Sequence, residues 1–188
     1  CVVASVTVTI IRWWLLVRAL DLPFTMASAF RLGFLGYLLN FVSLGSVGGD
    51  LFKAVFIARE QPNRRTEAVA TVVVDRVVGL YALFLVAATA LFLSDVDSIR
   101  TVAQLRTIAT AAYFCTAVGA VFIVLLLITG FASGPISKWL VGLPGAGPVI
   151  ANIFLAVRMY RQRYLVLIVA LIMSFAVHSL LAIAIWLI

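Results

Sequence analysis

The chain has 188 residues, of which 65% are hydrophobic and only 11% are charged, and its mean hydropathy is +1.21. A soluble fold of this length could not bury so much apolar surface, so the composition excludes an ordinary soluble domain and predicts an all-α, polytopic helical membrane protein. The formal net charge of +7 does not indicate nucleic acid as a partner, because the basic residues cluster between apolar runs, as the positive-inside rule describes for bilayer proteins.

Two apolar helices are expected at the start of the chain. Residues 1–20 predict one helix, in which Arg12 beside Trp13 is typical of an interfacial anchor, where a helix end reaches the lipid headgroups. Pro23 discourages continuation of this helix. A second apolar helix is expected over residues 24–41.

A glycine-rich loop over residues 42–49 leads into a short helix over residues 50–60. At about 1.5 Å per residue this helix rises only about 16 Å, roughly half of a hydrocarbon core of about 30 Å. We therefore expect the second and third helices to form a re-entrant hairpin, which enters the membrane and returns to its own side. The alternative is a full span followed by a short, sunken return helix.

A long helix is expected over residues 66–93, enough to cross a bilayer with tilt. Asp75 and Arg76 lie about ten residues into it, hence about 15 Å below its start and near the middle of the bilayer. Two further apolar helices are expected over residues 102–128 and 164–188.

A Gly/Pro-rich connection over residues 130–147 and a helix over residues 148–160 separate those last two apolar segments. Sidedness then follows from the basic segments. The loop that contains Asp95 and Asp97 is expected to face out, and the basic segments are expected on the cytoplasmic side: Arg12 with Arg18, residues 59–65 and residues 138–163.

The stretch of residues 40–76 places polar groups within this apolar sequence. Glycine-rich backbone at membrane depth persists only where protein or a water-filled cavity surrounds it. Ionisable residues at that depth usually mark the path of a substrate or an ion. The candidate substrate-binding residues are Asn40, Gly48, Gly49, Asp50, Lys53, Asp75 and Arg76.

The glycine loop and the start of the short helix leave alternatives open. Successive backbone N–H groups and a helix N-terminus can hold an anionic oxygen, such as a lipid phosphate, but glycines also simply permit a tight turn and close packing. Asp50 can cap the helix and pair with Lys53, or it can hold a cation such as Arg76 or the amine of a headgroup. Asn40 can cap the preceding helix or bond across to the broken backbone.

Asp75 and Arg76 are adjacent on one helix, so their side chains point about 100° apart and do not face each other well. Each is expected to meet a partner on another element, with Asp50 and Lys53 the nearest candidates. A structural pair is one interpretation of Arg76; the other is a phosphate-binding guanidinium, because Arg suits bidentate phosphate contacts better than Lys does.

The remaining chemistry-bearing residues indicate no catalysis. His178 is a lone histidine on an apolar helix, where hydrogen-bonded packing is expected more often than proton transfer. Cys1 and Cys115 form no disulfide framework and have no metal-ligand spacing. We therefore expect no catalytic residue, no metal and no cofactor.

The chain resembles the lysylphosphatidylglycerol synthase transmembrane-region family, also described as a flippase-like domain, over nearly its whole length. The family loop usually contains a Leu-Pro-Gly step, and here Ser43-Leu44-Gly45 lacks the proline. The resemblance rests on Arg12-Trp13, Asn40, Gly45-Ser46-Val47-Gly48-Gly49-Asp50-Leu51, Lys53 where the family often has Arg, Asp75-Arg76 and Gly79-Leu80, and more weakly on residues 155–164.

The resemblance implies one transmembrane flippase-like domain over residues 1–188, with re-entrant helices, in a bacterial inner or plasma membrane. In relatives this region moves an aminoacylated phospholipid between leaflets beside a soluble synthase domain. Both ends of the chain lie inside apolar helices, so we expect a piece of a longer protein.

Two hypotheses follow. The first is a protein that translocates a phospholipid or another lipid-linked anionic headgroup between leaflets, with membrane lipids as its partners. The second is a membrane-embedded lipid-binding or anchoring module of a fused or partner lipid-modifying enzyme. A homo-oligomer is compatible with both.

Overall fold

The computed structural model describes residues 2–42, 48–93, 103–127 and 159–187. Within these ranges it contains six α-helices, one short 3-10 helix and no β-strand, so the all-α prediction is confirmed. The helices are α1 (Val2–Ala19), α2 (Met26–Val42), α3 (Gly48–Glu60), α4 (Arg65–Leu93), α6 (Ala103–Leu127), η2 (Arg161–Arg163) and α9 (Tyr164–Trp186).

The helix boundaries lie close to those expected, because uninterrupted apolar runs separated by polar or proline-containing turns set them. The short helix α3 begins at Gly48 rather than at Asp50, so Asp50 lies within its first turn. The expected helix over residues 148–160 and the loops at residues 43–47 and 94–100 lie almost entirely outside the described residues.

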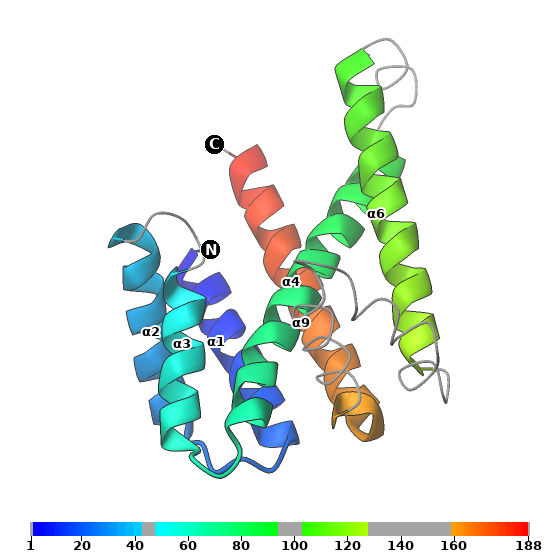
Figure 1. Cartoon of the computed structure of the whole chain (residues 1–188). Coiled ribbons are helices and arrows are strands. Elements are labelled where there is room, and N and C mark those ends of the chain that lie inside the picture. The colour runs from blue at the N-terminus through cyan, green and yellow to red at the C-terminus, as the bar shows by residue number, and fades with distance from the viewer. Residues whose placement is uncertain (1, 43–47, 94–102, 128–158, 188) are drawn as a thin grey trace.

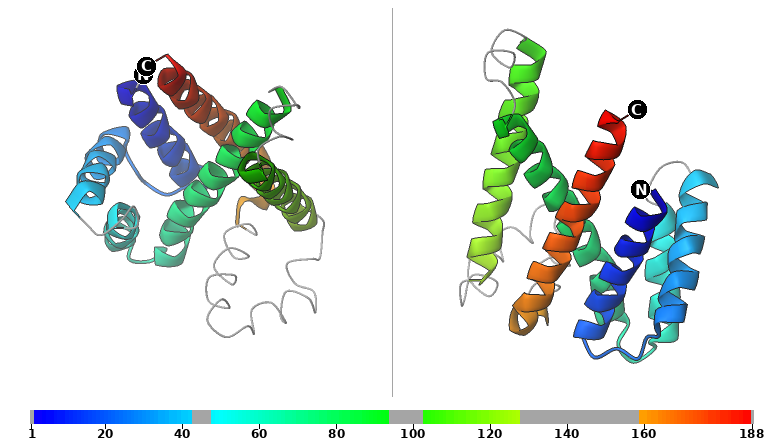
Figure 2. Two further views of the ribbon diagram at one scale, coloured as in Figure 1. Left: turned by 90° about the horizontal axis from the view of Figure 1, so that it is seen from above. Right: turned by 180° about the vertical axis from the view of Figure 1, so that it is seen from behind.

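Three helices form the centre of the structure. α1, α4 and α9 with the preceding η2 are long and apolar enough to cross a membrane, and each contacts the other two. α2 and α3 pack side by side as a hairpin, with α2 against α1 and α3 against α4, while α6 packs on α4 (Figure 1). Seen from above, the hairpin and α6 lie on opposite sides of the three central helices (Figure 2).

The buried core lies where the hairpin meets α1 and α4. Trp13 is fully buried and meets the ring of Phe24 edge-on, with the ring centroids 5.3 Å apart. Tyr160 is also fully buried, and its hydroxyl donates a 2.6 Å hydrogen bond to the carbonyl oxygen of Leu16. Burial raises the pKa of the Tyr160 phenol, because a charged phenolate is costly away from water. By contrast, α9 leaves Leu165, Ile172 and Ile183 exposed, as a lipid-facing helix does.

Basic residues lie at one end of the bundle and connect its helices there. The C-terminal ends of α1 and α3 and the N-terminal ends of α2, α4 and α9 all lie at this end (Figure 1). Arg64 Nη2 donates to the carbonyl oxygen of Leu20 at 2.9 Å, and Arg163 Nη2 lies 2.9 Å from Asp21 Oδ2. These contacts join the turn after α1 to the starts of α4 and α9. We call this end of the bundle the basic end.

The hairpin depends on close contact between two backbones. An added Cβ at Gly49 would collide with the carbonyl oxygen of Gly36 and would lie 2.6 Å from Asn40 Oδ1. Asn40 Oδ1 instead accepts a 2.8 Å hydrogen bond from the Gly49 N–H. Both outer ends of the hairpin lie at the basic end, and its re-entrant depth stays a prediction.

We expect Gly49→Ala to destabilise the protein, although alanine is the better helix former by about 1 kcal/mol. The new methyl group would meet the Gly36 backbone and the hydrogen-bonded Asn40 side chain, neither of which can move away easily. Overpacking of this kind costs about 1–3 kcal/mol. Thermal unfolding in detergent should show a lower melting temperature than wild type. Leu51→Ala, on the same helix but at a side chain that is 64% exposed, is the control; an unchanged or raised melting temperature for Gly49→Ala would contradict the packing role.

Candidate functional site

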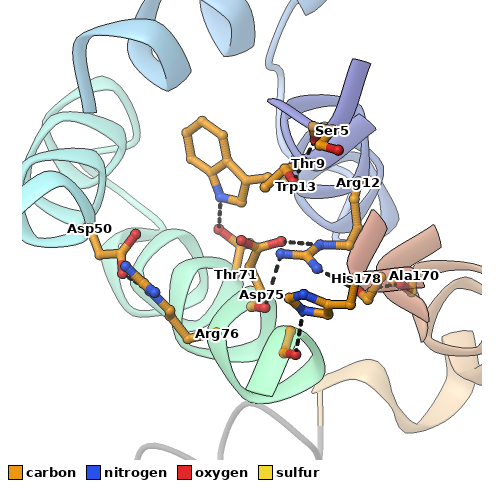
Figure 3. A network of polar contacts seen from close by, with 12 residues as sticks. Ser5, Thr9, Arg12, Trp13, Asp50, Thr71, Asp75, Arg76, Ala170 and His178 are labelled. Atoms are coloured by element: carbon orange, nitrogen blue, oxygen red, sulfur yellow. Dashed lines mark hydrogen bonds and ion pairs between the residues drawn. The ribbon is translucent and has the colours of Figure 1, made fainter. Parts of the chain in front are cut away.

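An ion pair joins α1 to α4 in the interior of the bundle. Arg12 Nε donates to Asp75 Oδ1 at 2.8 Å, and Arg12 Nη2 donates to the Asp75 carbonyl oxygen at 3.3 Å (Figure 3). The two side chains are only 7% and 10% exposed. Arg12 lies seven residues before the end of α1, about 10 Å along its axis. The interpretation of Arg12 as an interfacial anchor on the cytoplasmic face is therefore wrong, because its charge is neutralised inside the protein.

The same guanidinium also reaches α9. Arg12 Nη1 donates to Ser174 Oγ, and Ser174 Oγ donates to the carbonyl oxygen of Ala170 at 2.7 Å. One turn further along α9, His178 Nε2 donates to the carbonyl oxygen of Gly79 at 3.1 Å, which agrees with the hydrogen-bonded packing role expected for it. Polar contacts thus connect α1, α4 and α9, the three described helices that are long and apolar enough to cross a membrane.

A second ion pair joins the hairpin to α4. Arg76 Nε contacts Asp50 Oδ2, and the two side chains are 50% and 20% exposed. Figure 3 shows Asp75 and Arg76 leaving α4 in different directions, one toward α1 and the other toward α3. The expectation that each meets a partner on another helix is confirmed. Asp50 is the partner expected for Arg76, whereas Asp75 pairs with Arg12 rather than with Lys53.

The Lys53 side chain extends from α3 toward α1 and α2, and Lys53 is only 7% exposed. Its Nζ is 5.4 Å from the ring centroid of Trp13 and 6.0 Å from that of Tyr37, at the distance of a cation–π interaction. The Trp13 ring is itself held by a 3.3 Å hydrogen bond from Nε1 to Thr71 Oγ1. Lys53 therefore faces aromatic rings. Of the two cations considered for Asp50, Arg76 forms the ion pair and Lys53 does not.

One backbone N–H group near the tip of the hairpin already has a hydrogen-bond partner within the protein. Asn40 bonds across to Gly49, one of the two roles expected for it, so the Gly49 N–H has its partner within the protein. This contact supports the packing role for Gly49. Gly48 begins α3, and residues 43–47 of the loop lie outside the described part of the chain.

The sequence interpretation missed Arg12, Ser174 and Trp13 as parts of this polar network. One signal existed: a carboxylate as deep as Asp75 requires a cation, and the arginines in apolar helices were few. Nothing in the sequence predicted the contact of Ser174 with Arg12, because a serine in an apolar segment is common and has no distinctive spacing. Among the described residues, no three His, Cys, Asp or Glu side chains gather where they could hold a metal ion.

Comparison with known proteins identifies the family of the chain. A family model described as the lysylphosphatidylglycerol synthase TM region matches residues 1–188, the whole chain. Comparison with curated proteins and with solved structures found no match.

Breaking the interior ion pair is expected to destabilise the protein strongly. Arg12→Met or Asp75→Leu alone leaves one buried charge without its partner, which costs about 3–5 kcal/mol, whereas the double variant removes both charges and should recover most of that loss. A double-mutant cycle of unfolding in nanodiscs measures the coupling between the two sites.

The control for this cycle is Arg163→Ala at the basic end. Its ion pair with Asp21 has the same kind of atoms at 2.9 Å, but the two side chains are 51% and 74% exposed, so its loss should change stability by at most about 1 kcal/mol. Equal effects of the interior and the exposed variants would show that the Arg12–Asp75 pair does not hold the helices together.

Proposed function

Because the chain belongs to the lysylphosphatidylglycerol synthase TM region family, we propose that this integral membrane protein moves an anionic lipid headgroup between the leaflets of the membrane. The observation that carries the proposal is the Asp50–Arg76 ion pair, which lies about 15 Å along α4 and is partly exposed. Ionisable groups at membrane depth are costly and usually serve a substrate path.

The proposed mechanism is an exchange of anions at Arg76. A lipid phosphate replaces the Asp50 carboxylate on the guanidinium, whose planar set of donors suits two phosphate oxygens. The guanidinium of Arg76 thus keeps an anion as its partner before and after the exchange. Asp50 then displaces the phosphate again, and the acyl chains remain in lipid throughout.

The other candidate residues support this exchange in different ways. Asp75 has a structural role in this proposal, since its carboxylate is bound to Arg12 and joins α4 to α1 rather than binding a headgroup. Asn40 and Gly49 hold the two helices of the hairpin together beside Asp50. Gly48 and Lys53 complete the proposed headgroup region on α3.

We propose that the protein lies in the plasma membrane with a re-entrant hairpin. We also propose that the basic end faces the cytoplasm. Arg18, Arg59, Arg161 and Arg163 all lie in terminal turns at that end. Such an excess of Arg is typical of cytoplasmic segments.

A second candidate function is a non-catalytic module that binds a lipid and presents it to a lipid-modifying enzyme. The family is described as the TM region of a synthase, which favours this function. The two functions differ in one observable: a presenting module binds the headgroup without moving it across the bilayer.

The first test measures the movement of a headgroup-labelled phosphatidylglycerol in proteoliposomes, using an impermeant quencher. Arg76→Ala should slow the movement by about 10- to 150-fold, because a hydrogen bond to a charged group contributes about 1.5–3 kcal/mol. Asp50→Asn should also slow it, because release then lacks the competing carboxylate.

Arg163→Ala is the matched control, since it removes an arginine from an ion pair outside the proposed site. Normal movement in folded Arg76→Ala and Asp50→Asn proteins would refute the site. A wild-type protein that binds the lipid without moving it would favour the presenting module.

The second test places single cysteines in a background with Cys1 and Cys115 replaced by serine. Met26→Cys at the start of α2, Asn63→Cys in the turn after α3 and Phe92→Cys at the end of α4 are all exposed. A membrane-impermeant maleimide should label Met26→Cys and Asn63→Cys from the cytoplasmic side and Phe92→Cys from the other. Labelling of the first two from opposite sides would contradict a hairpin that returns to its own side.

A further inference from the structure

The middle residue of α4 is a glycine that packing does not require. An added Cβ at Gly79 would lie 3.4 Å from Arg12 Nη1 and 3.5 Å from Arg12 Nη2, which is ordinary van der Waals contact. Alanine would therefore fit there, and alanine is the better helix former. Other helical glycines differ, because an added Cβ would lie 2.9 Å or less from a neighbouring atom at Gly33, Gly36, Gly49 and Gly119. Gly79 therefore contributes the freedom of its backbone rather than space for a neighbour.

The backbone around Gly79 receives hydrogen bonds from two other helices. In an α-helix the Gly79 N–H bonds to the carbonyl oxygen of Asp75, and Arg12 Nη2 on α1 donates to this same oxygen at 3.3 Å. His178 Nε2 on α9 donates to the carbonyl oxygen of Gly79 at 3.1 Å (Figure 3). A membrane helix bends at lower cost at a glycine where neighbouring helices satisfy the carbonyl groups that the bend releases. Both carbonyl groups have such a second donor.

The half of α4 before Gly79 is fixed to the rest of the bundle. Its two charged residues form the ion pairs to α1 and α3 described above. Thr71 adds the 3.3 Å hydrogen bond that it accepts from Trp13 Nε1. These contacts hold this half in one position relative to α1 and the hairpin.

The half of α4 beyond Gly79 is joined to α6. The ring of Tyr81 lies against Gly119, where an added Cβ would be 2.6 Å from two ring atoms. Thr116 Oγ1 donates to the carbonyl oxygen of Phe84 at 3.1 Å. Figure 1 shows this half of α4 running away from the hairpin toward α6. This half and α6 are therefore expected to move together.

We propose that Gly79 is a hinge, at which the second half of α4 and α6 tilt together relative to α1, the hairpin and the first half of α4. We call the tilting part the arm (residues 80–93 and 103–127). The end of α4 lies about 20 Å beyond the hinge, so a bend of about 20° displaces it by about 7 Å. The ion pairs of Asp75 and Arg76 stay intact, because both residues precede the hinge. We assign the tilt to the passage of the headgroup, and this assignment rests on the proposed function.

The test measures distances between pairs of spin labels by pulsed electron paramagnetic resonance, in phosphatidylglycerol and phosphatidylcholine nanodiscs, with Cys1 and Cys115 replaced by serine. Val3→Cys with Phe92→Cys spans the hinge, and both side chains are 77% exposed. The wild type should give two populations of distances about 7 Å apart. Gly79→Ala should reduce the minor population about fivefold, the ratio that the helix propensities of glycine and alanine imply. A single narrow distance in the wild type, or populations unchanged by Gly79→Ala, would overturn the hinge.

Two further label pairs are the controls. Val3→Cys with Asn63→Cys lies outside the arm, and Phe92→Cys with Phe114→Cys lies within it, all at exposed positions. Each pair should show one distance with and without Gly79→Ala, because neither spans the hinge. Two populations in either pair would show that the motion is not a bend at Gly79.

A second variant tests whether backbone freedom is the cause. Leu80→Gly added to Gly79→Ala moves the glycine by one residue, at a side chain that is 56% exposed. This double variant should recover the minor population; no recovery would show that the alanine methyl group acts instead, and would overturn the inference. In thermal unfolding, Gly79→Ala should melt at or above the wild-type temperature. A lower melting temperature would contradict the fit of alanine from which the hinge is inferred.

Failure of the hinge can be distinguished from failure of the proposed function. In the proteoliposome assay, Gly79→Ala should slow the movement of labelled phosphatidylglycerol about fivefold, and unchanged movement would refute the assigned role of the tilt. A bend that depends on Gly79, without lipid movement in the wild type, supports the hinge and refutes translocation. Lipid movement with a single narrow distance between the labels at positions 3 and 92 supports translocation and refutes the hinge.

Discussion

The buried ion pair between Arg12 and Asp75 is the interaction on which the rest of the structure depends. It is made at comparable depths on α1 and α4, and the contact of Arg12 with Ser174 extends it to α9. In an apolar interior these groups have no solvent to replace a lost partner, so a small rotation or slide of one helix is strongly unfavourable. The pair therefore specifies the register of three helices whose apolar surfaces alone would pack in many ways.

α4 has two consecutive charged residues with different surroundings. Asp75 turns to the interior and has a fixed partner, while Arg76 turns to the hairpin and forms a pair that is partly exposed. The adjacent positions diverge because successive residues of an α-helix are about 100° apart. A rigid frame and an accessible charge can thus lie side by side, which is the arrangement that a binding site between helices needs in order to keep its geometry while its ligand exchanges.

The hairpin brings the remaining polar groups to that accessible charge. Its two helices approach closely because Gly36 and Gly49 lack side chains, and the Asn40 side chain bonds to the Gly49 N–H. The same close approach places Asp50 against Arg76 and Lys53 against Trp13. Glycines that serve packing therefore have a direct effect on the proposed headgroup region, although they need not touch a ligand themselves.

The sequence by itself determined that the chain is a helical membrane protein and, to within a few residues, where its described helices begin and end, and it left Arg76 as one of several partners for Asp50. These conclusions follow from composition, from long apolar runs and from unusual charges, all of which are local properties. Only the tertiary structure decided that Arg12 lies inside, that Ser174 joins it and that Lys53 faces two aromatic rings. The physical reason is that lipid-facing and protein-facing sides of these helices are both apolar. Hydrophobic periodicity therefore cannot show which faces meet, and contacts between residues 63 and 162 positions apart leave no trace in the local pattern.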